Sequence, residues 1–314
     1  MTFPHIPVML KEVMEVLQPA PGEVFIDGTL GAGGHSEAIL NAIAPDGTLT
    51  AFDLDPEAIR IATDRLKPFA SRVTIVHDSY TSVRNYFPTD STVDGFLADL
   101  GVSSMQIDQA ERGFSFISDG PLDMRFSPDQ KFSASDIVNT WDESEIARIL
   151  WVYGEERNSH RIARAICEVR ENHPIQTTKE LAELIVSVQK RSREKIHPAT
   201  RSFQAIRIAV NGELDAIEKM LPEALELLKP GGRMAVISFH SLEDRIVKQF
   251  FRTESTDCLC PPEQPVCTCG HKARLKEITR HPIVAEREEI DENGRARSAK
   301  LRAAEKIRQG DEKR

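Results

Sequence analysis

The sequence predicts an α/β fold in which a mostly parallel sheet has helices on both faces, together with an inserted all-helical domain. Strand-like and helix-like segments alternate over residues 1–100, and a group of glycines follows the first strand. Residues 101–203 then show no convincing central strand, after which the alternation resumes. Alternating strand and helix units are typical of a doubly wound parallel sheet.

Four strands are predicted in the first part of the chain, because apolar and β-branched side chains form short runs there. They are residues 24–27, 48–54, 73–77 and 93–100. Helices are predicted at residues 35–43 and 56–66, and the second begins at a proline, which suits the first turn of a helix.

Amphipathic helical patterns fill the inserted segment. They cover residues 143–152, 159–171 and 178–189. The last helix opens with a capping box formed by Thr177 and Glu180.

The α/β pattern returns with a long helical stretch at residues 203–228, a Lys-Pro-Gly-Gly turn and an apolar strand at residues 234–239. The predicted domains are therefore a discontinuous α/β domain, residues 1–105 and 204–314, and the helical insertion, residues 106–203.

Composition describes a soluble globular protein, with 40% hydrophobic and 28% charged residues among 314. No apolar run approaches the length of a membrane span, and the first residues lack a secretory cleavage site. These features predict a cytoplasmic protein without a membrane partner. The net charge of −9 argues against indiscriminate nucleic-acid binding.

Two segments nevertheless carry a local excess of positive charge. Residues 186–207 and residues 294–308 each contain six lysines or arginines against one glutamate. Either segment alone is as well explained by a solvated helix face, but two of them on an acidic protein favour a phosphate-facing surface.

The glycine loop after the first strand predicts a nucleotide-type cofactor site. Its glycines are Gly28, Gly31, Gly33 and Gly34. Glycine lets the backbone approach a ligand closely, and an acidic residue about 20 positions later can accept hydrogen bonds from ribose hydroxyls. Asp53 has roughly that position, and Asp55 is the neighbouring candidate. The spacing is an imperfect dinucleotide fingerprint, so a dinucleotide site and a plain surface turn remain alternatives.

Several longer blocks are specific enough to indicate a family. They are residues 27–35 (DGTLGAGGH), 99–104 (DLGVSS), 110–116 (AERGFSF), 119–125 (DGPLDMR), 153–156 (YGEE), 197–201 (HPATR), 228–233 (LKPGGR), 238–245 (SFHSLEDR) and 295–298 (RARS). The first block and LKPGGR resemble class I S-adenosylmethionine-dependent methyltransferases. Together the blocks resemble, from end to end, the bacterial 16S rRNA cytosine-N4 methyltransferase family, known as RsmH or MraW.

That resemblance implies a class I methyltransferase (Rossmann-like) fold with an inserted helical domain. It also implies methyl transfer from S-adenosylmethionine to the exocyclic N4 amine of a cytosine in the decoding region of 16S rRNA, within the small ribosomal subunit. The transfer would be direct and in line, without a covalent enzyme–base adduct. The oligomeric state is not fixed by the sequence, and a homodimer is one state that it allows.

The resemblance further implies which residues bind the cofactor. They are Gly33, Gly34 and His35 around the methionine portion, Asp53 at the ribose, Tyr80 at the adenine, and Asp99 and Gln106 completing the pocket. Taken singly, Tyr80 is equally explained as a packing aromatic, Gln106 as a loop amide and His35 as a first-turn helix residue.

Asp99 and Ser103 are the candidate catalytic residues. An oxygen that accepts from an amine hydrogen would help to localise the nitrogen lone pair of cytosine, which is delocalised into the ring. Asp99 can supply that oxygen, or it can mainly contact the cofactor while Ser103 or backbone carbonyls polarise the amine.

Contacts with RNA are expected from basic residues in the insertion and in the blocks that lead to it. They are Arg112, Arg125, Lys190, Arg191, Arg193 and Arg201. Phe114 and Phe116 are candidates for the base pocket, or equally for hydrophobic anchors.

Cys258, Cys260, Cys267 and Cys269 form two C-x-C pairs that are candidate zinc ligands, with free thiols as the alternative. No cysteine lies directly after the fourth or fifth predicted strand, where the pocket is expected, and this argues against C5 methylation, since that reaction needs a cysteine nucleophile. Two other functions compete with rRNA methylation: an assembly factor without catalysis, and an NAD-dependent dehydrogenase on the same sheet.

Overall fold

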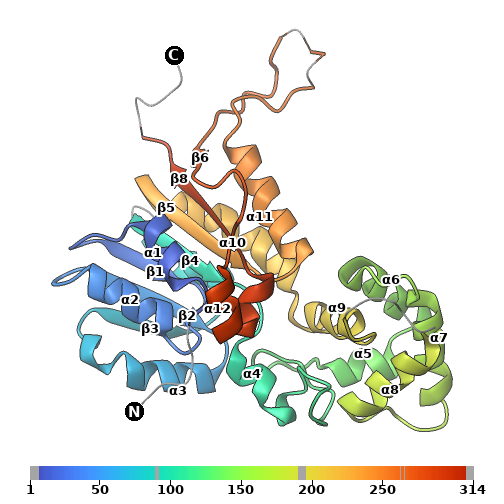
Figure 1. Ribbon diagram of the computed structural model, residues 1–314. Helices are drawn as coiled ribbons and strands as arrows, with labels where there is room; N and C mark the ends of the chain where they lie inside the picture. Colours follow the sequence, from blue (N-terminus) through green and yellow to red (C-terminus); the bar gives the residue numbers. More distant parts are fainter. Residues whose placement is uncertain (1–6, 89–91, 190–195, 262, 265, 309–314) are drawn as a thin grey trace. The chain divides into compact units, whose positions relative to one another are not determined.

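The computed structural model describes residues 7–88, 92–189, 196–261, 263–264 and 266–308. The chain forms two compact units (Figure 1). Unit 1 is Met1–Gly101 with Leu214–Arg314, and unit 2 is Val102–Glu213. The helical unit is thus an insertion in the α/β unit, and its second boundary lies later than the predicted residue 203.

An eight-stranded mixed sheet forms the centre of unit 1, with the order β3-β2-β1-β4-β5-β8-β6 and β7 paired to β8. The strands are β1 (Val24–Asp27), β2 (Thr48–Asp53), β3 (Val73–His77), β4 (Val93–Asp99), β5 (Leu228–Ser238), β6 (Leu275–Glu277), β7 (Ile283–Val284) and β8 (Lys300–Lys306). Strands β1 to β5 run parallel, whereas β8 is antiparallel to β5, β6 and β7. The carboxyl ends of β1, β2 and β4 therefore lie at one edge of the sheet.

Helices cover both faces of this sheet, as the fold class predicts. The helices of unit 1 are α1 (Leu10–Leu17), α2 (Gly34–Ala42), α3 (Pro56–Arg65), α10 (Glu213–Leu227), α11 (Ser241–Glu254) and α12 (Arg287–Glu292). One core joins α1, α2 and α3 to alternate strand residues such as Phe25, while the other joins α10 and α11 to their neighbours, such as Ile26. Successive strand residues face opposite cores because side chains alternate along a strand.

Unit 2 is helical. It contains α4 (Ser104–Asp108), α5 (Ala134–Thr140), α6 (Glu143–Gly154), α7 (Ser159–Arg170), α8 (Thr178–Val188) and α9 (Thr200–Asn211). Within its described residues the only extended pairing is an isolated bridge between Pro121 and Thr177. The predicted capping box is confirmed, since Thr177 accepts the Glu180 N–H. The core of this unit also includes Phe203 of α9.

The predicted strands and helices before residue 190 agree with the structure to within two residues at their ends. The long helical stretch predicted for residues 203–228 is helical but consists of two helices, because Gly212 has a left-handed φ of 59° and ends α9 before α10 begins. The Lys-Pro-Gly-Gly turn lies inside β5, as an irregular stretch where pairing with β4 skips from Leu228 to Arg233.

Part of the second basic segment, residues 294–308, is not available for the phosphate-facing surface that its charge predicted, although Arg297 is exposed. Half of it is β8, in the interior of the sheet, where the Arg302 side chain is only 6% exposed and pairs with Asp244 at 2.6 Å. The ammonium of Lys306 donates to the carbonyl oxygens of Leu225 and Leu228. Arg302 and Lys306 therefore connect β8 to α11, to α10 and to the start of β5. Among the described helices, none combines the length and apolar composition needed to cross a bilayer.

Gly95 of β4 provides a test of how closely the sheet is packed. It lies opposite Phe25 in the pairing with β1, and a Cβ at this position would come 2.0 Å from a ring carbon of Phe25. We expect Gly95→Ala to lower the free energy of unfolding by about 1–3 kcal/mol, because a buried ring has to move. Urea unfolding followed by circular dichroism measures the change.

Gly294→Ala is the matched control. Apart from its own chain neighbours, no heavy atom of the described residues lies within 4 Å of a Cβ placed there, so the free energy of unfolding should change by less than about 0.5 kcal/mol. Equal stabilities for the two variants would contradict the packing described for β1 and β4.

Candidate active site

The glycine loop connects β1 to α2 at the carboxyl edge of the sheet. Gly33 precedes α2 with φ of 77°, and a Cβ on it would lie 3.3 Å from the Cβ of Ala62 on α3. A Cβ on Gly28 would lie 3.3 Å from the Cβ of Tyr80. The loop therefore requires glycine at Gly33 for its conformation, and at Gly28 for its close approach to Tyr80.

Asp53, at the end of β2, fixes the loop from the neighbouring strand. One carboxylate oxygen accepts the Gly31 N–H at 2.8 Å and the other accepts the Asp55 N–H at 2.9 Å. Burial raises the pKa of Asp53 to about 6, although the two N–H donors oppose this rise. A carboxylate oxygen can accept more than one hydrogen bond, so Asp53 can still accept from a hydroxyl group.

Asp27, at the end of β1, connects the loop to the interior, and sequence reasoning missed it as a site residue. It is buried, and its oxygens accept the Ser36 hydroxyl at 2.6 Å and the Thr29 N–H at 3.0 Å. Burial raises its pKa. The signal was present in the sequence, because an acid closing a strand immediately before a glycine loop must lie at the same edge as the loop.

Asp99, at the end of β4, comes to the same place. Its N–H donates to the Thr29 hydroxyl at 2.6 Å, which connects β4 to the glycine loop. Its Oδ1 is buried and has no hydrogen-bond partner among the described residues. Burial, followed by the negative charges of Asp27 and Glu243, raises the pKa of Asp99 well above its usual value. Such an oxygen is a position where a bound molecule would supply the missing partner.

His35 lies beside Asp99 in the first turn of α2. Its Nε2 is 3.0 Å from the carbonyl oxygen of Val8, and its Nδ1 is 3.9 Å from Oδ2 of Asp99. Because a carbonyl oxygen only accepts, Nε2 carries a proton, and the ring is held between the segment before α1 and the carboxyl edge. Gly34 packs against the same segment, since a Cβ there would lie 3.0 Å from Pro7.

Tyr80 begins the 3-10 helix η2 (Tyr80–Tyr86), next to the glycine loop. It also packs against the core formed with α10 and α11, so the structure gives it a packing role beside the cofactor role that was predicted. Unit 1 thus brings Gly33, Gly34, His35, Asp53, Tyr80 and Asp99 to one edge of the sheet.

The other two residues predicted at the cofactor or the amine, Ser103 and Gln106, belong to unit 2. They form a capping box at the start of α4: Ser103 Oγ accepts the Gln106 N–H at 3.3 Å, and Gln106 Oε1 accepts the Ser103 N–H at 3.0 Å. Their roles in binding or catalysis stay predictions.

The arginines predicted to contact RNA are partly occupied within unit 2. Arg112 donates to the carbonyl oxygens of Arg125 and Phe126, both at 3.0 Å. Arg125 forms a two-bond ion pair with Asp123 at 2.9 and 2.6 Å. Arg201 lies in the first turn of α9. Lys190, Arg191 and Arg193 lie outside the described residues.

Phe114 and Phe116 pack within unit 2. The Phe114 ring stacks on Phe126 at 5.8 Å, and the Phe116 ring stacks on His197 at 4.5 Å. Both rings lie against the core of the helical unit, which is the hydrophobic-anchor alternative for these residues. The four predicted cysteine ligands lie together in the loop between α11 and β6, away from the glycine loop.

Comparison with known proteins connects this geometry to a family. Residues 2–307 match the model of the MraW methylase family. A protein named ribosomal RNA small subunit methyltransferase H from Heliobacterium mobile is 51% identical over 312 residues, covering 98% of this chain and 100% of that protein. The protein of the same name from Geobacter sulfurreducens is 52% identical over 311 residues, with 98% and 100% covered.

Among solved structures, an rRNA methylase from Streptococcus thermophilus aligns over 98% of this chain and 100% of its own, with a TM-score of 0.43 and 10% identity. That overlay is too loose to inform the site. The sequence relatives, by contrast, extend over nearly the whole chain and so cover both units.

The raised pKa of Asp53 predicts a pH dependence of stability. Because the pKa of Asp53 is about 6 in the folded chain against an ordinary value of 3.8, folded Asp53 binds more protons than unfolded Asp53 between these values. Stability from this group therefore falls as pH rises from about 4 to about 6. We expect Asp53→Asn to reduce that fall by about 1–3 kcal/mol, measured by urea unfolding across this pH range.

Asp64→Asn, at an exposed carboxylate on α3, is the control and should leave the pH slope unchanged. The slope is the readout because asparagine also loses one acceptor for the two N–H groups, which shifts stability at every pH. Identical slopes for Asp53→Asn and the parent chain would show that Asp53 titrates at its ordinary value.

Proposed function

The chain belongs to the MraW methylase family, and on that premise we propose that its substrate is a cytosine of ribosomal RNA. The chain is a methyltransferase and S-adenosylmethionine is its methyl donor. The proposed acceptor is the exocyclic N4 amine of cytosine 1402, in the decoding region of 16S rRNA within the small ribosomal subunit. The relatives that support this proposal carry the name ribosomal RNA small subunit methyltransferase H.

The observation that carries the proposal is the group of carboxyls at the carboxyl edge of the sheet. Asp27, Asp53 and Asp99 end β1, β2 and β4, and Asp99 has a buried oxygen without a partner among the described residues. When bound, S-adenosylmethionine supplies an electrophilic methyl group on a positively charged sulfur. A cation is attracted to a site where burial and neighbouring acids have already raised the cost of negative charge.

The residues present fit the parts of this cofactor. Gly33 and Gly34 let the loop turn into α2 with its backbone packed closely against Ala62 and Pro7, and the methionine portion would lie beside this first turn, next to His35. Asp53 keeps acceptor capacity for the ribose hydroxyls, and Tyr80 offers an aromatic ring for the adenine. No pyrophosphate has to be held, which accounts for glycine spacing that departs from a dinucleotide fingerprint.

Asp99 is the residue we assign to the acceptor amine. Transfer would form the N–C bond and break the S–C bond with its electron pair left on sulfur, and the proton lost by the nitrogen would pass to the Asp99 carboxylate or to water. A carboxylate that accepts an amine hydrogen draws the lone pair toward the methyl group before that proton leaves. Positioning the two reactants in line supplies much of the remaining rate.

The positions of the cysteines support attack by nitrogen over the C5 alternative. Cys167 lies in α7 of the helical unit, and the other four lie in the loop between α11 and β6. None of the five follows the carboxyl end of a sheet strand that carries the site. A covalent cysteine adduct, which C5 methylation requires, therefore has no nucleophile at this edge of the sheet.

The experiment that tests the function supplies the purified chain with radiolabelled S-adenosylmethionine and two RNA substrates. One is naked 16S rRNA, and the other is small ribosomal subunits from a strain that lacks the gene. Nucleoside analysis should find label in N4-methylcytidine. No label on either substrate would favour an assembly factor without catalysis, and label in C5-methylcytidine would contradict attack by nitrogen.

Asp99→Asn belongs in the same assay. We expect it to lower turnover by roughly 10²–10⁴-fold, the usual range for a group that handles a proton, while binding of S-adenosylhomocysteine changes far less. Full turnover in this variant would remove Asp99 from the chemistry and leave Ser103 or a backbone carbonyl to polarise the amine.

Cofactor binding and RNA binding should respond to different substitutions. Asp53→Ala is expected to weaken S-adenosylhomocysteine binding, measured by calorimetry, much more than RNA binding, because its carboxylate holds the glycine loop. Replacing Lys190 and Arg191 by Ala should weaken RNA binding and make it less salt-dependent, because two phosphate-facing charges are removed.

RNA binding is the control measurement for Asp53→Ala, and S-adenosylhomocysteine binding is the control measurement for the variant at Lys190 and Arg191. Equal losses of cofactor and RNA binding in either variant would contradict this division of roles between Asp53 and the basic residues of the insertion.

A further inference from the structure

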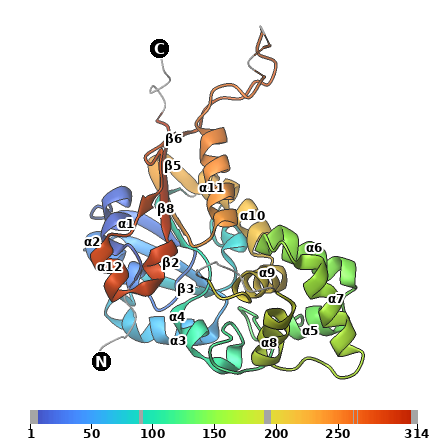
Figure 2. The ribbon, with the colours of Figure 1, turned by 45° about the vertical axis from the view of Figure 1, so that its right-hand side comes forward.

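The loop that connects α11 to β6 extends away from the end of α11 and then returns to the sheet at β6. It is easily seen in both views of the fold (Figures 1 and 2). We name residues 257–274 the cysteine loop, because they contain Cys258, Cys260, Cys267 and Cys269. Its apolar side chains are exposed, with Val266 at 70% and Leu259 at 48%. Between residues 257 and 270 no described side chain is buried, so hydrophobic burial does not fix the shape of the loop.

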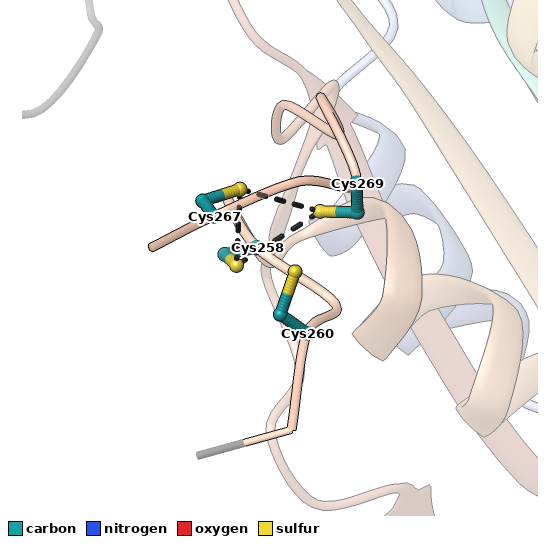
Figure 3. A group of neighbouring side chains, drawn as sticks. All are labelled: Cys258, Cys260, Cys267 and Cys269. Atoms are coloured by element: carbon teal, nitrogen blue, oxygen red, sulfur yellow. Dashed lines mark hydrogen bonds between the residues drawn. The ribbon is translucent and has the colours of Figure 1, made fainter. Parts of the chain in front are cut away.

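The four sulfur atoms nevertheless converge on one point (Figure 3). Cys258 Sγ lies 3.4 Å from Cys267 Sγ, Cys267 Sγ lies 3.6 Å from Cys269 Sγ, and Cys269 Sγ lies 3.9 Å from Cys258 Sγ. All four sulfurs lie within 4.8 Å of one another. A tetrahedral zinc with Zn–S bonds of about 2.3 Å places its sulfurs about 3.8 Å apart, which agrees with these separations.

Backbone donors support the same arrangement from both C-x-C pairs. The N–H of Leu259, inside the first pair, donates to Cys269 Sγ at 3.4 Å, and the N–H of Thr268, inside the second, donates to Cys260 Sγ at 3.4 Å. Each pair thus donates to a sulfur of the other. These two bonds hold the C-x-C pairs next to each other.

The turn between the pairs is closed by Gln264. Its N–H donates to the Pro261 carbonyl oxygen at 3.0 Å, and its side-chain amide donates to the Thr268 hydroxyl at 2.8 Å. His271, the nearest histidine in sequence, has its Nε2 3.0 Å from the Thr253 carbonyl oxygen. It is therefore occupied at the base of the loop, which leaves the four thiols as the ligand set.

We propose that Cys258, Cys260, Cys267 and Cys269 bind one zinc ion in a tetrahedral, four-thiolate site. Four sulfur ligands in a tetrahedron are typical of zinc or of iron–sulfur clusters. The mutual separation of the sulfurs suits a single ion, because the bridged irons of a cluster would spread the thiolates further apart. Four protein ligands leave no open position, which is the arrangement of a structural zinc and not of a catalytic one.

The position of the loop separates this zinc from the methyl-transfer site. α11 begins after His240 at the carboxyl end of β5 and runs for 14 residues, which is about 21 Å of helix. β6 then starts at Leu275, level with the amino end of β5, because Leu275 pairs with Lys306 next to the pairing of Arg233 with Glu305. The loop therefore emerges at the amino edge of the sheet, opposite the glycine loop.

The protein closes the base of the cysteine loop without a metal. Arg274 donates through its N–H to the Glu254 carbonyl oxygen at 2.7 Å, and its guanidinium pairs with the side chains of Glu254 and Glu226 at 2.7 and 2.6 Å. The zinc would connect the two sides of the loop farther from its base, by holding Cys258 and Cys260 next to Cys267 and Cys269. Metal binding of this kind contributes directly to the order of a segment that lacks a core.

The test is the metal content of the full chain, expressed with added zinc and purified in reducing buffer without chelators. Inductively coupled plasma mass spectrometry should find about one zinc per chain after dialysis, as expected for a closed four-thiolate site. Cys260→Ser with Cys269→Ser should reduce that content at least tenfold. Cobalt added to the metal-free chain should give the strong visible bands of a tetrahedral thiolate complex, and the double variant should not.

Cys167→Ser is the matched control, because that thiol lies in α7 of the helical unit and should leave the zinc content unchanged. Binding of S-adenosylhomocysteine by the double variant should equal that of the parent chain, which shows that the fold is intact. Zinc retained by the double variant, a parent chain without bound metal that takes up no cobalt, or iron with inorganic sulfide in place of zinc would each overturn the proposal. This outcome is independent of the rRNA assay.

Discussion

The structure of the α/β unit depends on burying carboxyl groups at the carboxyl edge of a parallel sheet. β1, β2 and β4 each end in an aspartate, and parallel pairing brings the three ends together. Asp27 is satisfied by Ser36 and Thr29, and Asp53 by two backbone N–H groups. Through these bonds the acids hold the glycine loop in place. The same burial raises their pKa values and prepares the edge for a positively charged ligand.

Sequence reasoning succeeded where a local pattern determines the outcome. Strand-end acids and the glycine loop predicted the position of Asp53, and helical periodicity predicted the insertion. One local signal was overlooked: Ser103 and Gln106 have the spacing of a capping box, and that is the role in which the structure shows them. Asp27 carries a similar local signal, because it ends β1 directly before the glycine loop.

Sequence reasoning failed where the outcome depends on a partner distant in the chain. The basic segment at residues 294–308 has the charge composition of an exposed surface segment. Arg302 nevertheless lies in a central strand, because Asp244, 58 residues away in sequence, neutralises its charge. Arg125 is a different case, because its acidic partner Asp123 is only two residues away in sequence, and its contact with RNA stays a prediction. A charge count cannot distinguish a cation that faces solvent from one that a distant acid has paired, since both have the same composition.

Asp99 differs from the other two aspartates because its Oδ1 has no hydrogen-bond partner among the described residues. A buried oxygen left in this state costs free energy that a polar partner would recover. The chain gives up that stability at the same edge where the glycine loop lies, because the Asp99 N–H donates to Thr29 of that loop. A ligand that satisfies Asp99 binds the folded state alone, and the folded state is then stabilised by the free energy of that binding. The free-energy cost of the unpartnered Asp99 oxygen in the free protein is therefore recovered on binding, and this recovery favours the ligand.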